Sequence, residues 1–128
     1  MTVARNLGIS VPQAMYDDFV KISEPIQKIR PDYPFEVKVR EPRKRPTRMG
    51  GTDASVFAIE GVPTLGFTTE DFKGYDFDYG EIWHTERDLY TKNIPEYQEH
   101  TATVTAIIAL GVANLDKQLS REGLYTEE

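Results

Sequence analysis

The two histidines, His84 and His100, are the side chains in this sequence with the widest chemical scope. An imidazole can serve as a general base or as a metal ligand near neutral pH. The chain has no cysteine, so any metal would have to use His, Asp or Glu. His84 lies in a segment without clear periodicity, Ile82–Asp88, whereas His100 lies in a helical pattern with polar neighbours. We interpret His100 as an ordinary exposed or half-buried helix residue and His84 as the candidate ligand.

A second group of chemically active side chains lies in residues 41–51. Prolines and glycines predict a loop there, and Arg43, Lys44, Arg45 and Arg48 make it locally positive in a chain of net charge −6. The loop is either a solvated surface segment or a site that attracts an anion such as a substrate carboxylate. The net negative charge of the whole chain argues against general nucleic-acid binding, which needs a basic face.

Apolar periodicity predicts the elements that position these groups. Apolar residues at spacings of three and four predict a helix over 12–30, which Pro25 should bend or divide into two. Alternation predicts a strand over 34–40. A long loop follows over 68–94, and such loops are often functional. A second long helix is expected from Pro95 to about residue 120.

The middle of the chain predicts a helix followed at once by a strand. Thr52 or Asp53 can cap a short helix that ends near Glu60, because either side chain can accept bonds from unsatisfied N–H groups. The apolar run over 62–67 is typical of a strand buried on both faces. A helix that leads directly into such a strand favours an α/β fold.

Short motifs then occur in a fixed order ahead of the last predicted helix: Gly50-Gly51-Thr52-Asp53 with Phe57, Gly61-Val62-Pro63, and Trp83-His84-Thr85 with Asp88. Together they resemble the C-terminal part of the aminopeptidase and glutamate carboxypeptidase family of co-catalytic zinc exopeptidases. The resemblance covers roughly 50–120, and 12–40 only as a helix followed by a strand. It implies that residues 1–128 are a single partial domain, the C-terminal portion of a three-layer α/β fold with helices packed on a mixed, mostly parallel sheet.

The resemblance also implies roles for individual residues. His84 matches the family's last zinc ligand. Trp83 stands where many members have a tyrosine that stabilises the oxyanion, and it can offer only an indole N–H on that side. Ala54 replaces a histidine common in many members. The residues expected at the substrate are Gly51, Thr52 and Arg48, and those expected to brace the site are Asp53, Thr85 and Asp88.

The family's dizinc centre needs further ligands upstream of the matched region, namely a His-x-Asp element, a Glu-Glu pair and another acidic residue. Residues 1–50 contain no histidine and no Glu-Glu pair. One imidazole cannot hold a catalytic zinc, which needs about three protein ligands. We therefore expect a C-terminal fragment of a zinc metallopeptidase, inactive alone, whose parent binds two zinc ions and acts as an aminopeptidase or a carboxypeptidase. The alternatives are a non-catalytic binding domain on the same fold and an unrelated small α/β domain.

Such a fragment has expected partners. Cutting a mixed sheet exposes strand edges and apolar helix faces, so the chain should self-associate or bind the missing N-terminal part of the peptidase domain. In the parent, the partner is a peptide substrate. No stretch reaches the roughly 18 apolar residues of a membrane span, and no signal-peptide pattern is present, although a secreted or periplasmic parent fits the resemblance.

Overall fold

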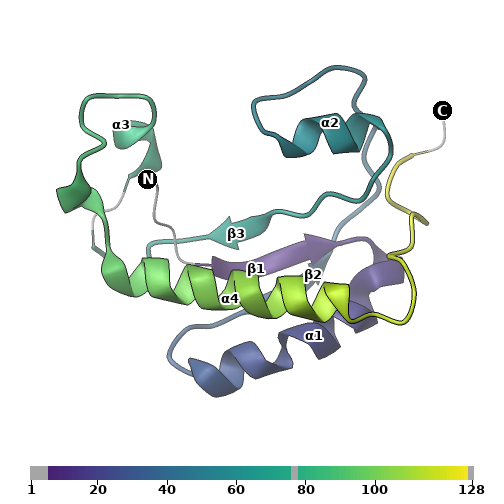
Figure 1. The fold of residues 1–128 in the computed structure, drawn as a ribbon, viewed down its shortest axis with the longest axis horizontal. Helices are drawn as coiled ribbons and strands as arrows, with labels where there is room; N and C mark the ends of the chain where they lie inside the picture. The colour runs from purple at the N-terminus through teal and green to yellow at the C-terminus, as the bar shows by residue number, and fades with distance from the viewer. Residues whose placement is uncertain (1–5, 76–77, 127–128) are drawn as a thin grey trace.

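The computed structural model describes residues 6–75 and 78–126, which form a mixed α/β fold (Figure 1). Its elements, in chain order, are β1 (Asn6–Val11), α1 (Tyr16–Ile29), β2 (Glu36–Val39), α2 (Ala54–Ile59), β3 (Phe67–Thr69), α3 (Tyr79–Ile82) and α4 (Pro95–Ala113). Single 3₁₀ turns, Gln13–Met15 and Tyr90–Lys92, precede α1 and α4. Within this part of the chain, no helix is long and apolar enough to cross a membrane.

The sheet has three strands in the order β2-β1-β3. β1 and β2 are parallel, and Ile9 lies opposite Val37. β1 and β3 are antiparallel, and Ile9 lies opposite Phe67. Gly8 is required where β1 meets β2, because a Cβ there would overlap the backbone carbonyl of Glu36. The α/β class is therefore confirmed, with a small mixed sheet in which one pairing is parallel and one antiparallel.

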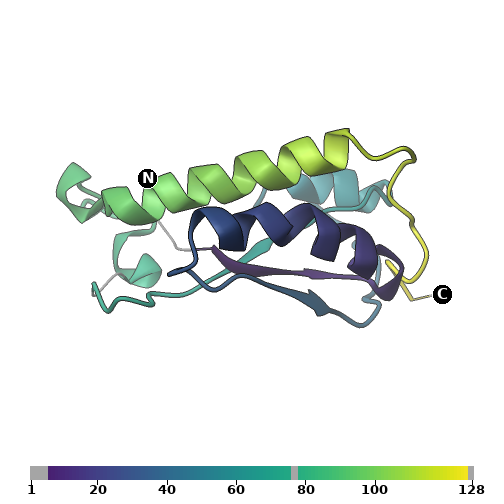
Figure 2. The same cartoon turned by 90° about the horizontal axis from the view of Figure 1, so that it is seen from below.

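Helices α1 and α4 lie together on one face of this sheet (Figure 2). The core between them and β1 consists of fully or nearly fully buried apolar side chains: Ile9, Val11, Met15, Phe19, Ile26, Val104 and Ile108. They recur every four or seven residues in the helical segments and every two residues in β1, which are the helical and strand periods. The opposite face carries exposed polar residues such as Glu36 and Lys38, which form an ion pair at 3.3 Å.

The predicted break at Pro25 does not occur, because α1 continues through it as one helix. Pro25 is exposed, while Phe19 and Ile26 on either side of it are buried on the core face. Burial of these two side chains is worth about 2 kcal/mol each, enough to offset the backbone hydrogen bond that proline removes.

Two other sequence predictions were wrong. The strand expected over 62–67 is an irregular, half-buried segment, and β3 begins only at Phe67, after Pro63 and Gly66 have interrupted the run. The last helix ends at Ala113 rather than near residue 120. The polypeptide then turns back, burying Leu124 completely.

This C-terminal segment fixes the basic loop that follows β2. The N–H of Thr126 donates to the carbonyl of Arg43 at 3.0 Å, and the hydroxyl of Tyr125 donates to the carbonyl of Ala58 at 3.1 Å. The chain end, the loop and α2 are thereby held together. Arg45 adds a further tie by donating to the carbonyl of Ile59.

Candidate functional site

His84 lies in a tight turn directly after α3. Trp83 has φ −59° and ψ 118°, His84 has a positive φ of 53°, and the N–H of Thr85 donates to the carbonyl of Ile82 at 3.1 Å. These are the features of a type II turn, whose third position normally takes glycine or asparagine. A histidine there adopts a backbone conformation that costs on the order of 1 kcal/mol, although His, Asn and Asp adopt it more often than other non-glycine residues.

One aromatic ring, that of Trp83, packs against the imidazole. The ring of Trp83 packs edge-on against His84 with 4.5 Å between centroids, and it stacks on Tyr79 at 6.2 Å. Trp83 is nevertheless 56% exposed, and both Tyr79 and His84 are exposed as well. The aromatic group therefore limits the orientation of the imidazole but leaves it accessible to a ligand.

The turn around His84 is held by the Thr85 hydroxyl and by the backbone of Asp88. The Thr85 hydroxyl donates to the carbonyl of Glu81 at 2.9 Å and accepts the N–H of Arg87 at 3.2 Å. The N–H of Asp88 donates to the carbonyl of Thr85 at 3.2 Å, which closes the next turn. The hydroxyl thus caps α3 and fixes the chain on both sides of His84.

The predicted substrate residues lie elsewhere on the surface. Arg48, Gly51, Thr52 and Asp53 are all exposed, in the loop and first turn that lead into α2. The expected cap by Thr52 or Asp53 is wrong. Asp53, at the N-cap, is itself in the helical region, and no side chain makes a capping hydrogen bond to α2. Helices α2 and α3 lie apart along the long axis of the molecule, so His84 does not meet this loop within the described structure (Figure 1).

The donor set around His84 contains one imidazole only. Within residues 6–75 and 78–126, no three His, Asp or Glu side chains come together in an arrangement that could hold a metal ion. A catalytic zinc needs about three protein ligands and a structural zinc four. The described residues alone therefore do not fit a zinc centre, and His84 offers a single ligand.

A polar cluster that sequence reasoning missed positions the segment before α3. Glu96, in the first turn of α4, accepts hydrogen bonds from Lys73, from Tyr33 and, at 2.9 Å, from Tyr75. These hydrogen bonds lower the pKa of Glu96 to about 2, and the bond from Lys73 has the largest effect. Burial, and then the Glu96 carboxylate, raises the pKa of Tyr33 to about 12. Residues 73–75 are in this way tied to α4 and to the end of α1.

His100 belongs to the buried side of the same region. The His100 side chain is 1% exposed, so the prediction of an exposed or half-buried position was wrong. Its ring stacks on that of Tyr33, with 4.2 Å between the ring centroids. Tyr97 lies beside it; its hydroxyl donates to Asp71 at 2.7 Å and accepts the N–H of Lys73 at 2.8 Å. Each of these contacts joins residues more than twenty positions apart in the sequence, so no local pattern reveals them.

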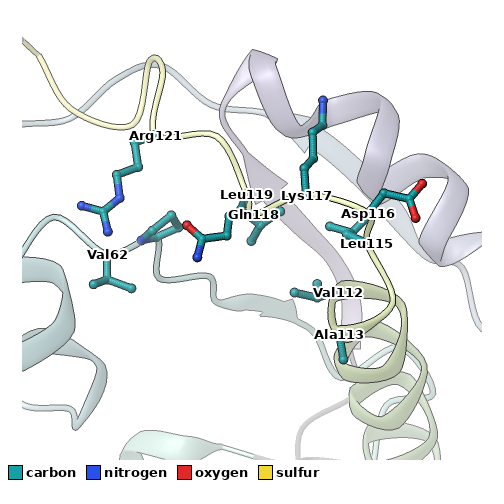
Figure 3. Close-up of a pocket in the computed structure, with 10 residues that line it drawn as sticks. Val62, Val112, Ala113, Leu115, Asp116, Lys117, Gln118, Leu119 and Arg121 are labelled. Atoms are coloured by element: carbon teal, nitrogen blue, oxygen red, sulfur yellow. The ribbon is translucent and has the colours of Figure 1, made fainter.

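A hollow of about 580 Å³ lies at the far end of α4, between its last turn and the segment at Val62 (Figure 3). Val112 and Ala113 come from the helix, and Asp116, Lys117, Gln118 and Arg121 from the segment after it. Val62 and Pro63 of the predicted Gly-Val-Pro motif line this hollow, but none of the predicted metal-binding, substrate-binding or bracing residues does. It therefore contributes nothing to the candidate site at His84.

Comparisons with protein-family models, with curated proteins and with solved structures found no match to this chain.

Proposed function

We propose that this chain is the C-terminal portion of a zinc-dependent exopeptidase domain, to which it contributes His84 as one metal ligand. The complete domain would hydrolyse peptide bonds at a chain end, with zinc supplying an activated water. By itself the chain would be inactive, because it offers one of the ligands that zinc requires. The three-layer fold is part of the proposal: α1 and α4 would form one helical layer, and the missing part of the domain would supply the other.

The observation that carries the proposal is the conformation of His84. A type II turn is cheapest with glycine or asparagine at this position, and yet it holds an imidazole at positive φ. Residues in such conformations concentrate at ligand and catalytic sites, where the surrounding structure holds them. The hydroxyl bonds of Thr85 and the ring of Trp83 provide that support here.

The surface around this turn supports a missing partner. Tyr79, Trp83, Leu89 and Tyr90 are each at least half exposed, and Tyr90 reaches 91%. Adjacent large apolar side chains of this kind usually mark a surface that another chain or segment covers. The strands β2 and β3 are both sheet edges, where further strands could pair. The covering segment would be the missing part of the peptidase domain, and in its absence a second copy of this chain.

The test is a peptidase assay on the complete reading frame that contains this chain. Three proteins are compared with chromogenic aminoacyl and C-terminally free peptide substrates: the wild type, His84→Asn and Glu86→Ala. Asparagine suits the positive φ and removes the imidazole, while Glu86 is an exposed neighbour in the same loop. We expect zinc-dependent hydrolysis that falls at least about 100-fold in His84→Asn, as for other lost metal-site groups, and is unchanged in Glu86→Ala.

The alternative is a non-catalytic binding domain on the same fold. It predicts a full-length protein without a His-x-Asp element or a Glu-Glu pair, without bound zinc and without hydrolysis. Any of these results with a folded, soluble parent would replace the peptidase proposal by this one.

A further inference from the structure

A groove of about 500 Å³ lies between the basic loop and α2. Two cations, Arg43 and Lys44, line it together with the hydroxyl-bearing residues Thr52, Ser55 and Thr64. No acidic side chain is among its described lining residues. Since the whole chain has a net charge of −6, this groove differs in sign from the protein around it.

Arg40 does not line the groove, but it carries a further positive charge close to Arg43. Its terminal nitrogens, Nη1 and Nη2, are buried and make no hydrogen bond within the described part of the chain. Burial, followed by the nearby charge of Arg43, lowers the pKa of Arg40. A buried guanidinium with no counter-charge is costly, and an anion bound close by would reduce that cost.

The groove is built by contacts that fix its shape. Arg43 donates to the Thr64 hydroxyl at 3.2 Å, which joins the loop to the segment before β3. The carbonyl of Arg43 accepts the N–H of Thr126, and Arg45 donates to the carbonyl of Ile59 in α2. Lys44, by contrast, makes no hydrogen bond or ion pair within the described residues, so its ammonium is available to a ligand.

We propose that this groove binds a phosphate group. The arginine and lysine side chains and the adjacent hydroxyls can donate hydrogen bonds to phosphate oxygens. The two lining cations and the nearby charge of Arg40 favour a doubly charged anion over a single carboxylate. The volume lies in the range of pockets that hold small molecules, so the phosphate can be free or carried as a monoester on a larger ligand. The site lies on α2 and the basic loop and does not rest on the proposal for His84, although Thr52 is also one of the predicted substrate residues.

The experiment titrates the 128-residue chain with inorganic phosphate and, separately, with phenyl phosphate, by calorimetry at constant ionic strength. Amide chemical shifts of Thr52, Ser55 and Thr64 locate the bound anion. The variants are Lys44→Ala, which removes a cation without breaking a described contact, and Arg40→Met, which keeps the apolar stem and removes the charge. Lys21→Ala, an exposed cation on α1, is the matched control.

We expect saturable binding that weakens roughly tenfold in Lys44→Ala and Arg40→Met, the change that about 1.4 kcal/mol produces, and that is unchanged in Lys21→Ala. Tighter binding of phenyl phosphate assigns the groove to a phosphomonoester, and weaker binding assigns it to the free ion; both keep it a phosphate site. Binding that is absent up to about 20 mM phosphate, about twenty times a millimolar Kd, overturns the proposal. So does equal weakening in all three variants.

Discussion

Gly111 permits a close approach of α4 to α1, and replacing it with alanine tests the packing of these two helices. An added Cβ would overlap Cγ2 of Ile22 and lie 2.9 Å from its Cγ1 and 3.1 Å from its Cβ. Because these atoms are next to the Ile22 backbone, the side chain cannot simply rotate away. Overpacking of this kind costs about 1–3 kcal/mol, whereas alanine gains up to about 1 kcal/mol in helix propensity. We expect a net loss of about 1 kcal/mol, or about 4 °C in Tm for a chain of this length.

The assay is thermal and urea unfolding followed by circular dichroism, in the wild type and in an Ile22→Ala background. Without the Ile22 side chain the overlap disappears, so Gly111→Ala should there raise Tm by up to about 4 °C. Ala109→Gly, at an exposed position of the same helix, is the propensity control and should cost about 1 kcal/mol. The reasoning is refuted if Gly111→Ala raises Tm in the wild type, or changes it equally in both backgrounds.

Three further predictions concern the Glu96 cluster. The pKa of Glu96 is lowered from 4.5 to about 2, so its contribution to the free energy of unfolding is complete above pH 4.5 and is lost as the pH falls towards 2. In an acid titration, Glu96→Gln should therefore lose stability less steeply than the wild type. The exposed control Glu99→Gln should lose stability as the wild type does. The raised pKa of Tyr33, 10.0 to about 12, means that stability falls between pH 10 and 12, and Tyr33→Phe should remove this dependence in alkaline unfolding curves. Tyr97→Phe leaves the N–H of Lys73 without its hydroxyl acceptor and should lower the free energy of unfolding in urea by about 1–3 kcal/mol. A decrease below about 0.5 kcal/mol would contradict the hydrogen bonds assigned to the Tyr97 hydroxyl.

Elements with a long, regular apolar pattern could be predicted from the sequence. The buried positions Phe19 and Ile26 define α1, and Val104 and Ile108 define α4, because their spacing matches the helical period. β1 was missed although Ile9 and Val11 alternate with Ser10, since three residues before a proline are a weak signal. The run over 62–67 looked like a strand because hydrophobicity was considered without the interruptions at Pro63 and Gly66.

The candidate site, like the fold, could be predicted from the sequence only in part. The sequence predicted only a long loop around His84, and the turn that the structure shows there is closed by local hydrogen bonds. The polar cluster could not be predicted, because Tyr33, Lys73 and Glu96 meet only when α1, the segment after β3 and α4 pack together. Arg40 was also overlooked: it ends an alternating strand pattern, and nothing in that local pattern predicts that its guanidinium nitrogens are buried.

The most direct test of the proposed function is a crystal structure of the complete protein grown with zinc, with anomalous data collected on both sides of the zinc absorption edge. The proposal predicts an anomalous peak about 2.0–2.1 Å from a ring nitrogen of His84, the usual zinc–imidazole distance. Zinc bound elsewhere with the His84 imidazole free of metal, or no zinc at all in a folded protein, would contradict it.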